Sequence, residues 1–341
     1  MLHNISILIL LSLMISACWE KQSHEITRPE PANYQLNGIV KDIDLDESLD
    51  SIKVKISTAL LLETDISFSK TTFTDEQGKF SFDTLYVGAY QMRFYRNGYE
   101  ALNKRYFQNY YDSTMTFYLP DVYYIPGSKI FAIHSGFSDS AIFSFHPEEP
   151  YVIFVKNPSS SLPDTVIYRH KWDREKQLWI QIQKYSKITD INIRDDKICI
   201  GKTPNYFYLL NKIKQLLYKI QLTATYLKEE ERYTLPHFGN DIYYAGEKIY
   251  ISAFNRIYIY DKLSFTLERE LTPSRPDIYI TSFCINTPYI WLSDNEADLL
   301  YQCDNELKVL KTYVPYYVHG IFHIYEMSYD YTGKDWYGKF N

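Results

Sequence analysis

Short stretches in which apolar and polar residues alternate run through most of the chain. The segment 52–56 places Ile, Val and Ile at every second position, and the segment 90–94 does the same with Tyr, Met and Phe. A period of two puts such side chains on one face of a β-strand. The stretches are rich in β-branched and aromatic residues, and the 341 residues include 34 Tyr and 19 Phe, which also favours strands. Because no segment shows a convincing amphipathic helical pattern, the sequence predicts an all-β protein.

The chain begins with a different pattern, an apolar run over residues 5–15. The run is too short to cross a bilayer as a helix, but it has the length of the core of a secretory signal. It ends in Ser16, Ala17 and Cys18, and this ending resembles the bacterial lipobox, in which the cysteine is acylated and becomes the mature N-terminus. The resemblance implies a signal peptide over residues 1–17 and a lipid anchor at Cys18. A plain secretory signal and an uncleaved apolar tail are the alternatives, because no Lys or Arg precedes the run.

Residues 18–34 are polar and contain Pro29 and Pro31, which predicts a flexible tether between the membrane and the folded part of the chain. No later stretch is apolar enough to span a bilayer. The expected location is therefore the bacterial cell envelope, with the lipid anchor in the outer membrane and the protein on its periplasmic or surface face. The membrane is the first expected partner.

Residues 35–120 predict a small β-sandwich of about seven strands. Asp75 to Gly78 is expected to form a tight turn in which Gly78 is free to take a positive φ, and a second turn is expected at Gly88. Alternating apolar residues follow each turn, and Gly98-Tyr99 marks a further turn before the last strand. The residues expected to face the core are Phe80, Phe82, Tyr90, Met92, Phe94, Met115, Phe117 and Leu119.

The order of these motifs is G-x-V, then T-D-x-x-G-x-F-x-F, then L-x-x-G-x-Y-x-M-x-F, then G-Y. It resembles the carboxypeptidase regulatory-like domain, which implies a transthyretin-like sandwich without catalytic activity. One departure is the acidic segment 42–48, which stands where that family has a glycine-proline turn. Asp42, Asp44 and Asp46 also match the start of a calcium loop, but Glu47 and Lys53 occupy the positions of its glycine and its last carboxylate, so a solvated acidic loop is favoured over a calcium site.

Residues 121–341 contain a degenerate repeat. Apolar strands at 151–155, 197–201, 248–252 and 289–293 are interpreted as equivalent, and each is followed by two more strands. Turn residues recur at Asp173, Asn211, Asp261 and Asp304, at steps of 38, 50 and 43 residues. A period near 45 residues with four short strands per unit resembles a β-propeller of the six-bladed or NHL-like kind.

Four whole blades are predicted in this region. Residues 321–327 and a strand at 129–133 are expected to form a fifth from the two ends of the domain. A single four-stranded blade cannot bury both of its faces, so blades stack around an axis. The alternative is an irregular pair of β-sandwiches.

Charge and cysteine content limit the partners and the redox chemistry. The formal net charge is −6 and no basic cluster is present, which argues against nucleic acid as a partner. After Cys18 the chain has Cys199, Cys284 and Cys303, all within apolar strand-like runs. An envelope location permits one disulfide among them, but buried free thiols are favoured.

The sequence offers few candidates for chemistry. His146 and Glu149 match the H-x-x-E zinc pair of metallocarboxypeptidases, with His170, His237, His319 or His323 as a third ligand, but a turn between strands is favoured. His319 and His323 are surrounded by aromatic residues and are expected to pack. No G-x-S-x-G elbow, P-loop or G-x-G-x-x-G motif is present. The sequence therefore predicts no catalytic, cofactor or metal residue, and Cys18 is the one assigned site.

Two interpretations of function remain open. The favoured one is a non-enzymatic, lipid-anchored binding or scaffolding protein of the envelope, whose propeller loops bind a protein or a glycan. Exposed tyrosines suit the stacking of sugars. The alternative is a glycan hydrolase or lyase with its site in the central funnel, for which a cluster of His, Arg and carboxylates at the inner-strand ends is the distinguishing feature.

Overall fold

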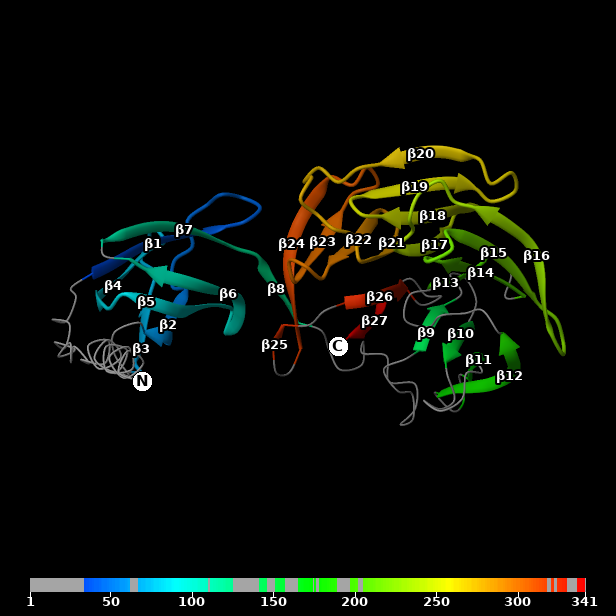
Figure 1. The fold of residues 1–341 in the computed structure, drawn as a ribbon, viewed down its shortest axis with the longest axis horizontal. Coiled ribbons are helices and arrows are strands. Elements are labelled where there is room, and N and C mark those ends of the chain that lie inside the picture. Colours follow the sequence, from blue (N-terminus) through cyan, green and yellow to red (C-terminus); the bar gives the residue numbers. More distant parts are fainter. Residues whose placement is uncertain are drawn as a thin grey trace, which may run out of the picture. The chain divides into compact units, whose positions relative to one another are not determined.

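The computed structural model describes residues 34–61, 67–109, 111–124, 141–145, 151–156, 165–173, 175, 178–188, 197–201, 205–317, 320–321, 324–329 and 336–340. Within these residues the regular secondary structure consists of β-strands, so the predicted all-β class is confirmed (Figure 1). The described residues divide into two compact units. The first comprises residues up to Lys41, Glu47–Phe94 and Asn103–Phe117, and the second comprises Asp42–Asp46, Tyr95–Leu102 and the rest of the chain from Tyr118.

The first unit is built on two sheets with seven strands in all; β1 and β4 pair antiparallel, whereas β1 and β7 run in the same direction, with Gln35 beside Asp112 and Ile43 beside Leu119. One sheet has the order β4 (Lys79–Leu85), β1 (Tyr34–Asp42) and β7 (Ser113–Leu119). The other has the order β3 (Ser69–Phe73), β2 (Lys53–Leu61), β5 (Gly88–Arg96) and β6 (Tyr99–Gln108). The sandwich of about seven strands predicted from the sequence is therefore present.

Aromatic side chains from both sheets fill the space between them. The ring of Phe94 on β5 lies 4.6 Å from that of Phe117 on β7, and the ring of Phe80 on β4 lies 6.0 Å from Phe94. The inward alternation of Tyr90, Met92 and Phe94 is confirmed, since none of them is exposed. The prediction for Met115 is wrong: period-two alternation places it on the same face of β7 as the buried Phe117 and Leu119, but 40% of it is exposed.

Two glycines of this unit are required by geometry. Gly78 has φ +71°, and a Cβ atom there would lie 2.5 Å from the carbonyl oxygen of Val40, so the predicted glycine turn is confirmed. Gly38 on β1 lies under the ring of Phe80, and a Cβ atom at Gly38 would lie 2.1 Å from that ring. The G-x-V motif of the sequence thus places a glycine where the aromatic core approaches the backbone.

Within the described residues, the second unit contains four sheets of four antiparallel strands each, here called blades 1 to 4, with two further strands on blade 4. β8 (Asp121–Tyr124) pairs in parallel with β24 at the edge of blade 4, and β25 (Gly320–Ile321) pairs with the same strand. Blade 1 consists of β9 (Ala141–Phe145), β10 (Tyr151–Lys156), β11 (Thr165–Asp173) and β12 (Leu178–Ile188), and blade 2 consists of β13 (Lys197–Ile200), β14 (Tyr206–Asn211), β15 (Leu216–Leu222) and β16 (Leu227–Thr234). Blade 3 consists of β17 (Asp241–Ala245), β18 (Lys248–Ala253), β19 (Arg256–Asp261) and β20 (Leu267–Leu271). Blade 4 consists of β21 (Ser282–Asn286), β22 (Tyr289–Asp294), β23 (Leu299–Cys303) and β24 (Val309–Tyr317).

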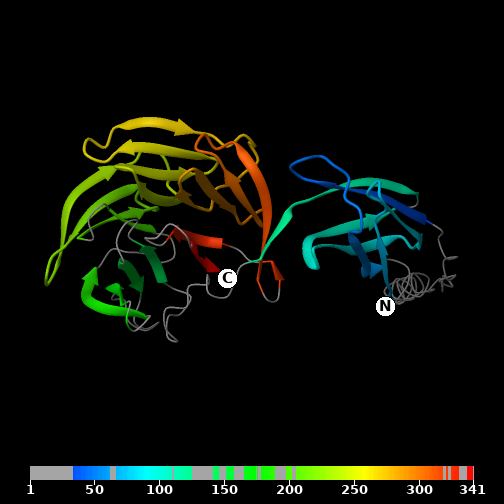
Figure 2. The same ribbon diagram turned by 180° about the vertical axis from the view of Figure 1, so that it is seen from behind.

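The first strands of the blades form a closed ring. β9, β13, β17 and β21 are in contact in this order, and β26 (Ile324–Tyr329) lies between β21 and β9 (Figures 1 and 2). β26 pairs with β27 (Trp336–Phe340), so a two-stranded hairpin from the C-terminal end occupies the fifth position. Within the described residues the unit is therefore a β-propeller-like ring of four four-stranded blades and a two-stranded fifth element, in place of the irregular pair of sandwiches. The predicted strand at 129–133 lies outside the described residues.

Blade 3 shows how period-two alternation builds this ring. Ile249 and Ile251 on β18 join the apolar core shared with blade 2, whereas Tyr250 between them packs against the core shared with blade 4. Tyr258 and Ile259 on β19 divide between the two cores in the same way. Each blade therefore needs an apolar neighbour on both sides, and a third such core joins blades 1 and 2.

The equivalence proposed for the repeats is wrong in one place. The segments 151–155, 248–252 and 289–293 are the second strands of their blades, but 197–201 begins with the first strand of blade 2. Asn211 accordingly ends a second strand, whereas Asp173, Asp261 and Asp304 lie at or after the ends of third strands. The final strand of blade 4 begins at Val309, so Leu307 lies in the preceding turn. First and second strands are apolar on both faces, and the pattern alone does not distinguish them.

The three cysteines of the second unit are buried free thiols, as expected. Burial raises the pKa of the Cys199 and Cys284 thiols well above the usual value. A thiol held in its neutral form is a poor nucleophile and metal ligand. These residues therefore pack as small apolar side chains in the blade interfaces.

Candidate functional site

Most of the residues singled out for chemistry lie outside the described part of the chain. This applies to Cys18, His146, Glu149, His319 and His323. Their predicted roles, and the enzymatic alternative with its site in the funnel, stay predictions. His170 lies on β11 and is 4% exposed, with its ring 6.3 Å from that of Tyr168.

His237 belongs to an aromatic stack between blades 2 and 3. Its ring lies 3.6 Å from that of Tyr258, and its Nε2 atom is 2.8 Å from the hydroxyl of Tyr260. The ring of Tyr260 is stacked at 4.5 Å on Phe265, which in turn lies 4.1 Å from Tyr233. Burial lowers the pKa of His237, against the opposing effect of the Phe238 carbonyl and Glu270. The stack favours the neutral imidazole, and its role is to close the interface.

The aspartates of the acidic segment do not form a cation site in the structure. Asp42 Oδ1 accepts hydrogen bonds from the backbone N–H of Asp44 at 2.8 Å and of Leu45 at 3.0 Å, and its other oxygen pairs with Arg96 at 2.9 Å. Burial raises the pKa of Asp42, but these hydrogen bonds and the guanidinium charge outweigh it and hold the pKa below its usual value. Across the described segments, no group of three His, Cys, Asp or Glu side chains gathers in a metal-binding arrangement.

A buried polar cluster joins the starts of three inner strands. Asp241 begins β17 and accepts hydrogen bonds from Ser282 Oγ at 2.5 Å and from the N–H of Phe283 at 3.0 Å, both on β21. Lys197, which begins β13, is also buried and its charge acts on Asp241. Burial raises the pKa of Asp241, and the Lys197 charge and the hydrogen bonds oppose this shift. The cluster is inaccessible and its carboxylate is saturated with donors, so it ties the ring together.

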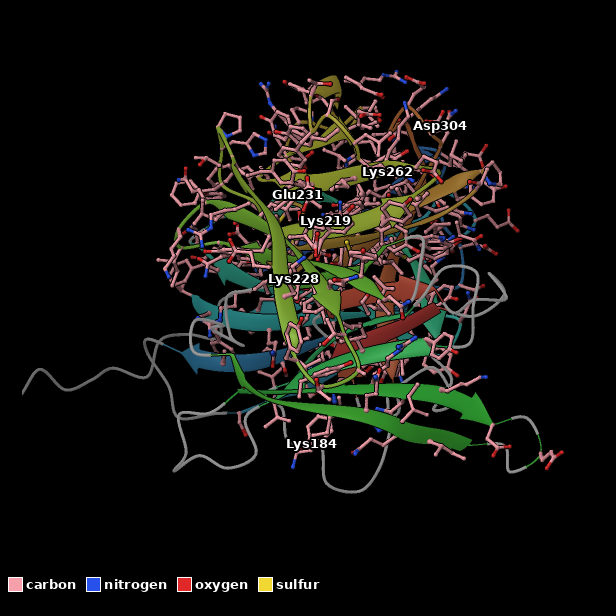
Figure 3. The ribbon with its side chains drawn as sticks, turned by 90° about the vertical axis from the view of Figure 1, so that its right-hand side faces the viewer. Lys184, Lys219, Lys228, Glu231, Lys262 and Asp304 are labelled. Atoms are coloured by element: carbon pink, nitrogen blue, oxygen red, sulfur yellow. The ribbon has the colours of Figure 1, made fainter. Side chains whose placement is uncertain are left out.

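The outer surface of blade 2 is a ladder of surface ion pairs. Lys219 on β15 and Glu231 on β16 lie side by side, as Figure 3 shows, with Nζ 2.5 Å from Oε1. Arg232 pairs with Glu229 at 2.9 Å on the same edge strand. Exposed pairs contribute at most about 1 kcal/mol each. Charged side chains on an edge strand also oppose edge-to-edge pairing with a strand of another chain.

A groove between blades 3 and 4 is a candidate site in the described part of the second unit. Its volume is about 490 Å³, which lies within the usual range of ligand sites. Strands β18, β19 and β20 form one wall, and the turn between β21 and β22 forms the other. The lining residues are Lys248, Tyr250, Ile259, Glu268, Arg269, Leu271, Ile285, Thr287, Pro288, Tyr289, Ile290 and Asn305.

Two tyrosine rings dominate the groove. Tyr250 is half-buried in the middle of β18, and Tyr289 is 39% exposed at the start of β22. Burial raises the pKa of Tyr250, so its hydroxyl stays protonated and can donate a hydrogen bond. Within the described residues, neither ring stacks on another aromatic ring and neither hydroxyl has a hydrogen-bond partner. Tyr260 differs from them, because its ring stacks on Phe265 and its hydroxyl forms a hydrogen bond with His237.

Charged groups of the groove are paired with one another. Lys248 pairs with Glu268, and Arg269 pairs with Glu306 beside Asn305. Ile259, Leu271 and Ile290 are buried and form an apolar floor. The groove thus combines an apolar floor, flat aromatic faces and a polar rim of balanced charge.

Sequence reasoning placed the strands of this groove but not the groove itself. The segments 248–252 and 289–293 were predicted as strands, and Tyr250 and Tyr289 were two tyrosines among 34. The available signal was the alternation that sends Tyr250 to the side opposite Ile249 and Ile251, but the depth of the interface depends on residues far away in the sequence. A second cavity of about 530 Å³ lies on the first unit beside Asn37 and Thr72. Its lining includes the exposed ring of Phe73 and the ring of Phe80, which is packed in the core.

No protein-family model matches the sequence, and no curated protein matches it. Solved structures with similarity include the glutaminyl cyclase of Myxococcus xanthus, at 10% identity over 59% of this chain and 87% of that one, with a TM-score of 0.41. A functionally unknown protein from Desulfotomaculum acetoxidans has 14% identity over 81% and 89% of the two chains and a TM-score of 0.35. The WD40 domain of Toxoplasma gondii coronin has 7% identity over 58% and 50% and a TM-score of 0.36. At these values the similarities assign no function to the chain.

Proposed function

We propose that the chain is a lipid-anchored binding protein of the bacterial cell envelope, and that its ligand occupies the groove between blades 3 and 4. The observation that carries the proposal is the pair of unpartnered tyrosine rings in a cavity of about 490 Å³. Aromatic residues that are exposed in a concave site are typical anchors for ligands and partner proteins. The rigid ring of blades holds the two tyrosines in fixed positions, which reduces the entropy lost on binding.

The lipid anchor is the part of the proposal that rests on the sequence. The apolar run before Cys18 and the polar tether after it suit an acylated N-terminus. No helix among the described residues is long and apolar enough to cross a membrane. The resemblance of residues 35–120 to the carboxypeptidase regulatory-like domain supports an accessory, non-catalytic role for the first unit.

Binding in the groove is tested by crosslinking in intact cells. A photoreactive amino acid replaces the exposed Thr287 in the full chain, and a matched control replaces Tyr226, which is 59% exposed at the turn between β15 and β16. Illumination is expected to give an adduct of defined mass at position 287 and none at position 226. Equal labelling at both positions, or none at either, contradicts a ligand in the groove.

The anchor is tested separately. Cys18→Ala is expected to abolish acylation and to move the full chain from the membrane fraction to the soluble fraction. Mass spectrometry of the wild-type N-terminal peptide is expected to show a diacylglyceryl group. A variant that stays in the membrane, together with an unmodified wild-type peptide, contradicts the lipoprotein assignment.

A further inference from the structure

We infer that the groove binds a neutral oligosaccharide, with pyranose rings lying against Tyr250 and Tyr289. The inference rests on the proposed function, because it names the class of ligand for the same groove. It follows from three features of the lining: the state of the two aromatic rings, the balance of charge and the arrangement of polar groups.

The aromatic rings offer flat apolar faces with no partner inside the protein. Other tyrosines of blade 3 are packed, since Tyr258 stacks on His237 and Tyr260 stacks on Phe265. Tyr250 and Tyr289 belong to the same pair of blades but line the cavity instead. A pyranose carries an apolar face of C–H groups that fits such a ring, and its hydroxyls point outward around the edge. Stacking therefore buries the apolar face of the sugar and leaves its hydroxyls at the rim.

The charge of the groove favours a neutral ligand. Each cation at the rim already has a carboxylate partner, with Lys248 beside Glu268 and Arg269 beside Glu306. A phosphate or uronate would have to displace a carboxylate, and a cationic peptide would have to displace Lys248 or Arg269. A neutral ligand leaves both ion pairs intact and avoids the desolvation of a further charge.

The polar groups at the rim suit vicinal hydroxyls. Lys248 and Arg269 line the cavity and supply donors, Glu268 lines it and supplies acceptors, and Glu306 lies beside the lining residue Asn305 as the partner of Arg269. Asn305 and Thr287 are exposed, and each carries both a donor and an acceptor. Each sugar hydroxyl is both a donor and an acceptor, so it can form hydrogen bonds with both kinds of group at the rim. An apolar side chain of a peptide would use the floor but would make no hydrogen bond to the remaining donors and acceptors of the rim.

Binding is measured with the full chain purified in a mild detergent. The probes are maltohexaose, cellohexaose, xylohexaose, mannohexaose and laminarihexaose, with a hexamer of galacturonic acid as the charged comparison. We expect at least one neutral probe to bind in titration calorimetry and the galacturonic acid hexamer not to bind. Tyr289→Leu is expected to weaken that binding by about tenfold, since it removes one stacking face.

Two variants separate stacking from general disruption. Tyr289→Phe keeps the ring and is expected to bind within about threefold of the wild type, because only a rim hydroxyl is lost. Tyr226→Leu removes an exposed tyrosine outside the groove and is expected to leave binding unchanged. Far-ultraviolet circular dichroism checks that each variant is folded.

The outcomes distinguish this inference from the proposed function. Absence of binding to every neutral probe, or binding that Tyr289→Leu and Tyr250→Leu leave unchanged, overturns the inference. If a protein is then crosslinked at position 287 in cells, the proposed function stands and the ligand is a polypeptide. If no adduct forms at position 287 either, both proposals fail.

Discussion

Blade 3 packs against blades 2 and 4, and the outer parts of these two interfaces differ in whether aromatic side chains fill them. Toward blade 2, an apolar core around Ile249 and Ile251 continues outward into the stack of His237, Tyr260 and Phe265. Toward blade 4, the core around Ile257 and Phe283 continues outward into the groove. The same β-strands supply both faces, so the difference does not come from the strand pattern.

The difference comes from the segments beside the strands. His237 lies in the loop before β17, and Phe265 lies in the turn between β19 and β20, where both add rings to the interface with blade 2. On the other side the outer strand β20 carries Glu268 and Arg269, which are exposed and paired, and no ring covers Tyr250. An inter-blade space is therefore closed or left open by a few loop and edge residues.

The largest effect is expected from a matched pair of truncations on neighbouring strands of blade 3. Tyr260→Ala removes a ring that is 3% exposed and breaks the stack, which is expected to lower the free energy of unfolding by about 3–5 kcal/mol. Tyr250→Ala removes a half-exposed ring from the groove and is expected to cost about 1 kcal/mol, since little burial is lost. Urea unfolding followed by tryptophan fluorescence measures both, because four of the five tryptophans lie in the second unit.

Equal losses of stability for the two variants would contradict the comparison. That result would mean that the groove is closed in solution and that Tyr250 is packed. A matched control is Tyr226→Ala, whose ring is mostly exposed and belongs to neither interface of blade 3. It is expected to change the free energy of unfolding by less than about 0.5 kcal/mol.

The next effect concerns the buried tie between blades 3 and 4. Asp241→Asn keeps the shape, but the two carboxyl oxygens accept from Ile242, Ser282 and Phe283, so replacing one oxygen with an amide leaves at least one of these donors without an acceptor. The change also removes the negative charge that acts on Lys197. We expect a loss of about 1–3 kcal/mol near neutral pH. The loss is smaller than for a fully ionised pair, because burial already favours the neutral carboxyl.

The pH dependence of this loss follows from the raised pKa of Asp241. Below the ordinary value of 3.8 the carboxyl is protonated in both states. As the pH rises through the folded-state pKa, the wild type loses stability, because the unfolded carboxylate ionises more readily. The destabilisation caused by Asp241→Asn is therefore expected to shrink as the pH rises from 4 to 7, as measured by urea unfolding at fixed salt. A difference that grows over this range would show that the pKa is lowered.

The sequence predicted the architecture well because alternation is a local signal. The strands around Tyr90 and Phe94 were predicted with their inward faces, and Gly78 was predicted to take its positive φ. The propeller-like ring was predicted from repeated apolar strands. The position of one strand was predicted wrongly in blade 2, because the apolar pattern of the first strand at 197–200 does not differ from that of the second strands of the other blades.

The groove was beyond such reasoning. β16 and β20 are edge strands with mostly polar residues, so the alternation that marks other strands is absent from them. Tyr250 and Tyr289 are separated by 39 positions, and their shared cavity depends on how two blades pack. Local patterns fix which residues leave a strand on one side, but not whether a loop elsewhere fills the space they face.

The stack between blades 2 and 3 predicts its own pH dependence. His237 has a lowered pKa because it is buried, so its stabilising contribution is present above the ordinary value of 6.5 and is lost as the pH falls through the folded-state pKa. His237→Gln removes this titration and is expected to give a shallower loss of stability between about pH 7 and pH 5. Parallel slopes for the wild type and the variant would place His237 outside the energetics of the stack.

The smallest effect is expected at Ser252, on the side of β18 that faces blade 4. Its side chain is fully buried, and among the described residues its hydroxyl has no hydrogen-bond partner, although its strand neighbour Asp241 is saturated. A buried hydroxyl without a partner destabilises the folded state, so Ser252→Ala is expected to be neutral or to raise the free energy of unfolding by up to about 1 kcal/mol. The same urea experiment measures it, with Ser282→Ala as the contrast, because that hydroxyl donates to Asp241 and its loss is expected to cost about 1–2 kcal/mol. If Ser252→Ala destabilises as much as Ser282→Ala, the Ser252 hydroxyl has a partner in solution, and the interface with blade 4 is wetter and more polar than its counterpart with blade 2.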